Sequence, residues 1–244
     1  MRIPRFYYPE VLALGARVSL PQAAAHHAVR VLRMAEGDGV TLFNGDGYVY
    51  HAKILRCDKS DVAVLIEQQT ASANESPLQV TLVQGISSGE RMDFTLQKSV
   101  ELGIAAIQPI EAERSVVKLT AERKEKRLRH WQNIVIAACE QCGRNVVPSV
   151  LAPLSLTAWL GGQDSGAVLR IHLSPDAALG LRNLEKPTGP VVLAVGPEGG
   201  FSEQEHSALQ QGGFVAVKLG PRVLRTETAA LAALAALQTC WGDF

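Results

Sequence analysis

The sequence predicts a small β-rich domain followed by a larger α/β domain with a mostly parallel sheet. In the first 70 residues, short runs with β-branched or aromatic residues are separated by turn residues, at Val40–Phe43, Tyr48–Leu55 and Val62–Glu67. The stretch 68–77 is small and polar and ends in a proline, which is typical of a boundary between domains. Beyond it, strand-like and helix-like segments alternate, which indicates a parallel sheet covered on both faces. We therefore expect one domain over residues 1–72 and a second over residues 73–244.

The spacing of apolar residues predicts the individual elements. In the first domain, the strands are expected to form a small barrel, with one helix over Gln22–Met34. In the second domain, strands are expected at Leu78–Ile86, Ile104–Ile110, Ala167–Leu173, Val191–Val195 and Phe214–Leu219. Helices are expected at Glu90–Leu102 and Ala121–Cys142, and another begins at the capping box of Ser202 and Glu205.

The composition of the sequence excludes several classes of protein. Hydrophobic residues make up 47% of the 244 residues and charged residues 20%, which is typical of a folded protein. The formal net charge is zero, so a nucleic-acid partner must be argued from local clusters. The N-terminus lacks the apolar core of a signal peptide, and the longest apolar run falls far below the roughly 18 residues that span a bilayer. Four cysteines make no disulfide framework. We expect a cytoplasmic protein without a membrane partner.

The stretch 191–230 holds the strongest candidate for a ligand site. Two apolar runs in it each end in a Gly-Pro pair, Gly196-Pro197 and Gly220-Pro221, and each is followed by a helix-like segment. In open α/β sheets, ligands bind at the carboxyl ends of such strands. The glycine-rich loop that contains Glu198 could be only a tight turn, but it also suits close approach of the backbone to a ligand. We favour a ligand site.

The second of these loops carries two arginines without an obvious packing role. Arg222 and Arg225 flank a Val-Leu pair, and a guanidinium suits a phosphate or a planar base. Thr226 is expected to be the N-cap of the helix that follows, and Glu227 lies at the positive end of its dipole. Leucines three residues apart then form a stripe that indicates a core or a subunit interface, at Leu231, Leu234 and Leu237.

A basic run and several absent motifs narrow the function. Residues 123–129 contain five basic residues and one acidic residue, which fits either a solvated helix face or contact with phosphates. Cys139 and Cys142 share an apolar stripe and lack a second pair at metal-ligand spacing, so we expect buried thiols and no metal. The sequence contains no Walker motif, no dinucleotide fingerprint and no nucleophile elbow.

Four blocks resemble the signature blocks of one family, at Gly85–Gly103, Glu140–Pro148, Val195–Glu205 and Leu219–Leu234. The family is that of the bacterial ribosomal RNA small-subunit uridine N3-methyltransferases, in the SPOUT superfamily. The stretches Met1–Tyr7 and Val31–Asp38 resemble its PUA-like domain, so the resemblance covers nearly the whole chain. It implies an α/β SPOUT domain with a deep trefoil knot, preceded by a PUA-like β-barrel. Periodicity alone would not predict a knot, because knots are essentially absent from proteins.

The resemblance also implies a cofactor, partners and site residues. S-adenosylmethionine would be the methyl donor, 16S ribosomal RNA in the small subunit the substrate, and a homodimer the working form. The cofactor would contact Leu173, Val195, Gly196, Pro197, Glu198, Gly199, Gly200, Leu219, Gly220, Val223, Leu224, Arg225, Thr226 and Thr228. RNA phosphates would contact Arg2, Arg5, Arg30, Arg33, Arg91, Arg114, Lys118, Arg123 and Arg144.

The catalytic group is left open by the sequence. For methylation of N3 of a uridine, Glu198 or Glu227 could act as a general base. Alternatively, Arg222 or Arg225 could stabilise a uracil oxyanion without a base. Our hypothesis is that Arg225 contacts the target nucleotide. Two other functions compete with this one: methylation of a ribose 2′-hydroxyl by a related enzyme, and RNA binding by a non-catalytic ribosome-assembly factor.

Overall fold

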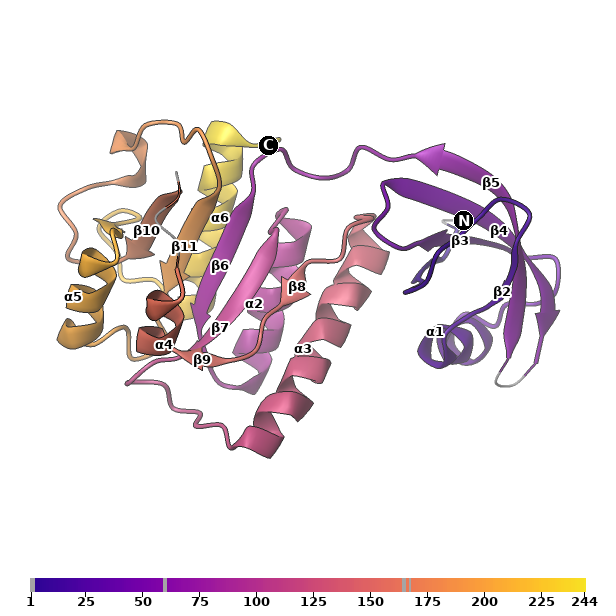
Figure 1. Cartoon of the computed structure of the whole chain (residues 1–244), viewed down its shortest axis with the longest axis horizontal. Coiled ribbons are helices and arrows are strands. Elements are labelled where there is room, and N and C mark those ends of the chain that lie inside the picture. Colours follow the sequence, from indigo (N-terminus) through magenta and orange to yellow (C-terminus); the bar gives the residue numbers. More distant parts are fainter. Residues whose placement is uncertain (1–2, 59–60, 164–165, 167) are drawn as a thin grey trace. The chain divides into compact units, whose positions relative to one another are not determined.

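The computed structural model describes residues 3–58, 61–163, 166 and 168–244 (Figure 1). Arg2 and the expected strand start at Ala167 lie outside these residues. Contacts divide the chain into two compact units. The N-terminal unit comprises Met1–Glu75 together with Cys139–Val147, and the C-terminal unit comprises Ser76–Ala138 together with Pro148–Phe244.

The N-terminal unit is built on a curled five-stranded sheet in the order β1-β3-β4-β5-β2. Its elements are β1 (Arg5–Tyr7), β2 (Arg17–Ser19), α1 (Gln22–His26), the π-helix η1 (His27–Val31), β3 (Gly39–Phe43), β4 (Tyr48–Cys57) and β5 (Val62–Ala71). Strand β1 pairs with β3 in parallel, and the other pairs are antiparallel. The three longer strands are confirmed, whereas the two three-residue strands lack an apolar period that would predict them.

The helix predicted to reach Met34 is wrong at its C-terminal end. The α-helical hydrogen bonds change to π-helical ones at His27, and the helix stops at Val31. Arg33 then takes a backbone φ of 55°, which makes it the one non-glycine residue with positive φ among those the structure describes. This conformation is strained for a residue with a Cβ and ends the helix.

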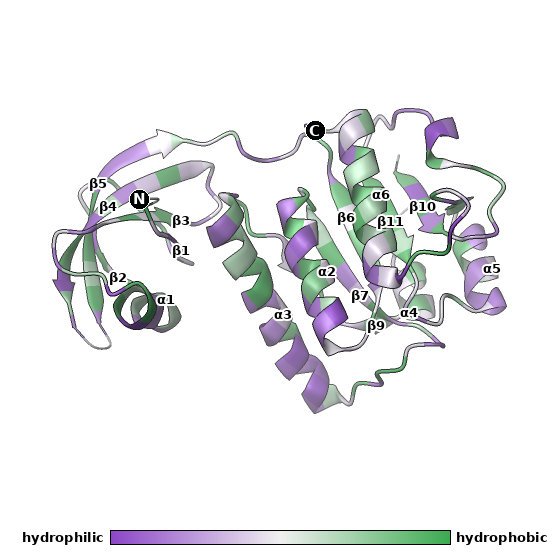
Figure 2. Ribbon diagram, turned by 180° about the vertical axis from the view of Figure 1, so that it is seen from behind, coloured by the Kyte–Doolittle hydropathy of each residue, from purple (hydrophilic) through white to green (hydrophobic). Residues whose placement is uncertain are grey.

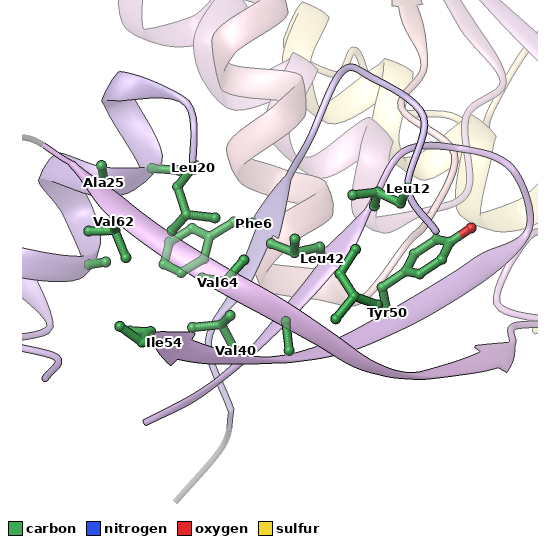
Figure 3. Close-up of a cluster of buried hydrophobic side chains, with 14 residues drawn as sticks. Phe6, Leu12, Leu20, Ala25, Val40, Leu42, Tyr50, Ile54, Val62 and Val64 are labelled. Carbon is green, nitrogen blue, oxygen red and sulfur yellow. The ribbon is translucent and has the colours of Figure 1, made fainter. Parts of the chain in front are cut away.

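The core of the N-terminal unit lies inside the curl of the sheet. Figure 3 shows Phe6, Leu42, Tyr50 and Val64 facing one another, with Ala25 of α1 against the same cluster. These residues come from four strands and one helix, so their burial holds the sheet in its curl. A fully buried large apolar side chain contributes about 1.5–3 kcal/mol.

A carboxylate attaches the segment after α3 to the N-terminal unit. One oxygen of Glu75 accepts hydrogen bonds from Arg144 Nη2 at 2.6 Å and Nε at 2.9 Å. The other oxygen accepts from the backbone N–H groups of Asn145 and Val146, each at 3.0 Å. Arg5 donates to the Asn145 side chain at 2.7 Å, and its guanidinium lies 4.9 Å from the centre of the Phe43 ring.

The C-terminal unit contains a parallel sheet in the order β12-β10-β11-β6-β7-β8, with β9 pairing with β7. Its strands are β6 (Val80–Gly85), β7 (Ala106–Glu111), β8 (Ser149–Val150), β9 (Leu154–Ser155), β10 (Leu169–Leu173), β11 (Val191–Val195) and β12 (Val215–Val217). Its helices are α2 (Gly89–Glu101), α3 (Ala121–Cys142), α4 (Leu156–Gly161), the 3₁₀-helix η2 (Leu181–Asn183), α5 (Glu203–Gln211) and α6 (Thr226–Trp241); the last residues of α3 pack with the N-terminal unit. The predicted parallel sheet is confirmed.

Helices cover both faces of this sheet. Helices α2 and α6 lie on one face, and α4 and α5 on the other (Figures 1 and 2). Successive side chains of a strand point to opposite faces. Accordingly, Val83 packs with Trp159 of α4 and Leu209 of α5, whereas the neighbouring Gln84 donates to Thr226 of α6. Figure 2 shows α6 as largely hydrophobic and the first turns of α3 as hydrophilic. Among the described residues, no helix combines the length and apolarity needed to cross a membrane.

The Glu75→Ala variant should lower the free energy of unfolding by about 2 kcal/mol. It leaves the buried Arg144 guanidinium without its carboxylate, and part exposure of Glu75 keeps the loss below that of a fully buried pair. Urea denaturation followed by circular dichroism measures the loss. Glu67→Ala, an exposed acid on β5, is the control, and an equal midpoint in both variants would contradict the attachment role of Glu75.

Candidate active site

A cavity of about 520 Å³ lies at the carboxyl ends of β10, β11 and β12. Because these strands are parallel, the loops that follow them meet at one edge of the sheet. The walls are residues 173–176 after β10, residues 195–201 after β11 and residues 217–226 after β12, apart from Pro221. This volume lies within the range of about 300–1,000 Å³ that is usual for small-molecule sites.

The glycine-rich loop after β11 passes very close to β6. A Cβ on Gly85 would overlap the nitrogen and Cδ of Pro197 and would lie 2.8 Å from the carbonyl carbon of Gly196. Gly200, with φ of 69°, lets the loop turn back toward α5. The capping box of Ser202 and Glu205 then begins α5, as predicted. The glycines therefore fix the path of this wall of the cavity.

Thr226 joins the two predicted loops. Its hydroxyl donates to the carbonyl oxygen of Gly196 at 2.6 Å and accepts from Gln84 Nε2 at 2.9 Å. The prediction that Thr226 is the N-cap of α6 is wrong, because Arg225 is the N-cap and Thr226 is the first helical residue. The hydroxyl is directed at the neighbouring loop instead of at its own helix.

Glu198 lies in the cavity wall, but its carboxylate is engaged by the protein. One oxygen accepts from Ser88 N at 2.9 Å, Ser88 Oγ at 3.0 Å and Arg91 Nη1 at 3.3 Å. Burial by itself would raise the pKa of Glu198, but the hydrogen bonds from Ser88 and Arg91 outweigh it and hold that pKa below its usual value. A carboxylate that is this strongly held ionised is a weak proton acceptor.

Unlike the carboxylate of Glu198, the guanidinium groups of Arg222 and Arg225 have no polar partner among the described residues. Both line the cavity and are exposed, and within the part of the chain that the structure describes neither side chain makes a hydrogen bond or an ion pair. Val223 between them is 81% exposed. Glu227 lies outside the set of lining residues, and its carboxylate is 3.9 Å from Arg91 Nε. The two arginines thus present unpaired positive charge to the cavity.

Nearly all residues predicted to contact a cofactor line this cavity. The lining includes Leu173, Val195–Gly200, Leu219, Gly220 and Val223–Thr226. Thr228 is not part of the lining and is exposed on α6. Sequence reasoning missed Asp176, Lys218 and His206, which do line it. Asp176 follows a strand in a Ser-Pro-Asp turn, so the strand-then-turn pattern could have indicated it, whereas the position of His206 within α5 carries no such signal.

A buried histidine lies next to one of the residues that line the cavity. The ring of His172 on β10 lies 5.2 Å from that of the lining residue His206. Burial, and to a lesser degree the neighbouring His206, lowers the pKa of His172 to about 4. His172 is therefore neutral at pH 7 and adds no charge to the cavity.

The predicted RNA contacts fall into two groups. Arg30, Arg33 and Arg123 are exposed. The others make contacts within the protein: Arg5 and Arg144 in the N-terminal unit, Arg91 with Glu198, Arg114 with the carbonyl of Gly199, and Lys118 with the carbonyls of Ala112 and Glu113. Arg2 lies outside the described residues.

Two family models match the chain. A model described as an RNA methyltransferase domain matches residues 74–238, and one described as an RNA methyltransferase PUA domain matches residues 20–67. Among curated proteins, Ribosomal RNA small subunit methyltransferase E of Buchnera aphidicola subsp. Schizaphis graminum is 38% identical, over 99% of this chain and 98% of that protein. The protein of the same name from Bacillus subtilis is 34% identical, over 90% and 88%.

Solved structures agree with these matches. The Ribosomal RNA small subunit methyltransferase E of Neisseria gonorrhoeae, bound to S-adenosyl methionine, is 47% identical with a TM-score of 0.93, over 100% of both chains. A putative methyltransferase of Legionella pneumophila, in complex with the bound cofactor SAM, is 42% identical with a TM-score of 0.96, again over 100% of both chains.

The Gly85→Ala variant should be destabilised by about 1–3 kcal/mol, because the added methyl group meets the backbone of the loop at Pro197. Thermal unfolding of the purified protein measures this change. Gly89→Ala is the matched control, since a Cβ there meets nothing within 4 Å. An unfolding temperature equal to that of the wild type in both variants would show that the loop tolerates the methyl group.

Proposed function

We propose that this chain, which belongs to the ribosomal RNA small subunit methyltransferase E family, methylates N3 of a uridine in 16S ribosomal RNA. Membership is shown by the family models and by relatives that match the chain over nearly its whole length. The chain is therefore an RNA methyltransferase that acts on small-subunit ribosomal RNA. The choice of N3 is our proposal, and the observation that carries it is the pair of unpaired arginines in the wall of the cavity.

S-adenosylmethionine is the methyl donor in this proposal. The cavity has the size of a small-molecule site, and its glycine-rich walls leave backbone groups close to any ligand inside. The residues that would hold the cofactor are Leu173, Val195–Gly200, Leu219, Gly220, Val223, Leu224 and Thr226, whereas Arg225 is assigned to the nucleotide. When bound, the cofactor supplies an electrophilic methyl group on a sulfonium. The trefoil knot, which the family resemblance implies, belongs to the same proposal.

Arg225 is the group that we assign to the uracil. N3 of uridine must release its proton to solvent water before it can accept a methyl group, and the negative charge that remains spreads onto the carbonyl oxygens of the base. An unpaired guanidinium at the cavity wall can donate to those oxygens and stabilise that charge. Glu198 is a poorer alternative base because Ser88 and Arg91 donate to one of its oxygens and lower its pKa, which weakens it as a proton acceptor.

The N-terminal unit supplies an RNA-binding surface in our proposal. Around the end of η1, Arg30 and Arg33 are exposed and flank Val31, which is 63% exposed, and Leu32. Two cations beside exposed apolar side chains suit a phosphate backbone with an unstacked base. Arg123 in the C-terminal unit is a further exposed candidate. Residues 1–72 would act as the RNA-binding domain and residues 73–244 as the methyltransferase domain.

Three further parts of the proposal come from the family resemblance. The substrate would be the assembled small subunit, the enzyme would work as a homodimer, and its location would be the cytoplasm. In the stripe that suggested a subunit interface, Leu234 and Leu237 are buried within this chain and Leu231 is half-buried. Only Leu231 is therefore available to a partner.

The Arg225→Ala variant should lower the rate of methyl transfer by about 10²–10³-fold, because it removes the donor for the uracil charge. The affinity for S-adenosylmethionine, measured by calorimetry, should stay near that of the wild type. Arg182→Ala, an exposed arginine of η2 outside the cavity lining, is the control. Equal losses of rate and cofactor affinity would overturn the assignment of Arg225 to the nucleotide.

Purified enzyme should methylate small subunits from a strain that lacks the activity, and one methylated base should appear. Nucleoside mass spectrometry distinguishes N3-methyluridine from a ribose-methylated nucleoside. A ribose product would refute the N3 proposal. Absence of any methylated product, together with absence of cofactor binding, would favour the non-catalytic assembly factor.

A further inference from the structure

We propose that Arg91 is a positioning residue for methyl transfer: it pairs with Glu198 and Glu227 and thereby keeps Arg225 unpaired. This inference rests on the proposed function, since it concerns the charge that Arg225 presents to the nucleotide. Arg91 was predicted from the sequence as a phosphate contact, and the structure places its side chain between two carboxylates instead.

Arg91 connects three separate elements of the C-terminal unit. It lies in the first turn of α2, and its Nη1 is 3.3 Å from Glu198 Oε1 in the loop after β11. Its Nε is 3.9 Å from Glu227 Oε1 in the first turn of α6. The same guanidinium lines the cavity. One cation therefore links the glycine-rich wall to α6, the helix whose N-cap is Arg225.

The two carboxylates depend on Arg91 to different degrees. Glu198 also accepts two hydrogen bonds from Ser88, so it stays in place without the arginine. For Glu227, Arg91 is the one cationic partner among the described residues. Each carboxylate has a second oxygen that is buried and without a partner within the described ranges. The cluster thus contains two negative charges and one positive charge.

The charge balance determines what happens when Arg91 is removed. Glu227 would then be an unpaired, mostly buried carboxylate, which is unfavourable. The nearest cations along the chain are Arg225 and Arg222, which are free in the folded protein. An ion pair between Glu227 and Arg225 would neutralise the guanidinium that the uracil charge requires. Arg91 prevents this by holding Glu227 on the side of α2.

A phosphate-contact role for Arg91 predicts different behaviour. An RNA contact contributes to binding, so its loss weakens RNA affinity and reduces the dependence of that affinity on salt. If Arg91 is a positioning residue, its substitution lowers the rate at saturating RNA. A second substitution that removes the freed Glu227 carboxylate then restores that rate. The two roles are therefore separable by a double-mutant cycle between Arg91 and Glu227.

The experiment uses the full chain, S-adenosylmethionine and small subunits in single-turnover assays, with wild-type activity measured first. Arg91→Met should lower the rate at saturating RNA by about 10²-fold, and cofactor affinity should change by less than about threefold. Glu227→Gln alone provides the reference rate for the cycle. The Arg91→Met/Glu227→Gln double variant should return close to the Glu227→Gln rate, and Arg91→Lys should retain part of the activity. Lys98→Met, which breaks a surface pair with Glu101 on the same helix, is the control.

Each other outcome overturns the inference. Losses that add in the double variant would show that Glu227 is not the carboxylate that Arg91 restrains. An unchanged rate at saturation, with weaker and less salt-dependent RNA binding, would make Arg91 a phosphate contact. A parallel loss of cofactor affinity would make it a wall of the cofactor pocket. A wild-type protein that fails to methylate small subunits would instead remove the proposed function itself.

Discussion

The hydrogen bond from the Thr226 hydroxyl to the Gly196 carbonyl is the contact on which the geometry of the cavity depends. It joins two loops whose residues are 30 positions apart, and it is completed by Gln84 from the strand beneath. The glycine-rich loop is fixed from the other side by its close approach to Gly85. With both loops restrained, the helix that follows Arg225 starts at a defined point of the cavity wall. The position of this part of the cavity wall is thus set by the hydrogen bonds of Thr226 and by the close contact at Gly85.

Electrostatics then divides the charged groups at this edge into two kinds. Two acids are engaged, Glu198 by Ser88 and Arg91 and Glu227 by Arg91, while Asp176 also lines the cavity and is exposed. The side chains of Arg222 and Arg225, in the loop that leads into α6, have no partner among the described residues. Neutral His172 leaves this distribution unchanged. A site arranged in this way favours a ligand that becomes negatively charged during reaction, which is what a uracil does when it loses the proton at N3.

The sequence predicts the C-terminal sheet and the cavity well, and the N-terminal unit less well. Val191–Val195 is an uninterrupted apolar run closed by Gly-Pro, so both its strand and its loop are visible locally. The predicted end of the first helix is wrong, because nothing in the local sequence indicates the positive φ at Arg33. The role of Arg91 could not be predicted either, since its partners lie more than 100 residues away and no periodicity connects them. Family resemblance located the site blocks but not the contacts among them.

The attachment of Cys139–Val147 to the N-terminal unit has a consequence for the synthesis of the chain. Glu75 and Arg5 are made early, yet their partners at Arg144 and Asn145 leave the ribosome only after most of α3. At about 5–20 residues per second, the intervening stretch takes several seconds to translate. During that time the first 75 residues have a core but lack the loop that completes them. The N-terminal unit therefore finishes folding after translation of the other unit has begun. Folding of the N-terminal unit thus overlaps in time with synthesis of the C-terminal unit.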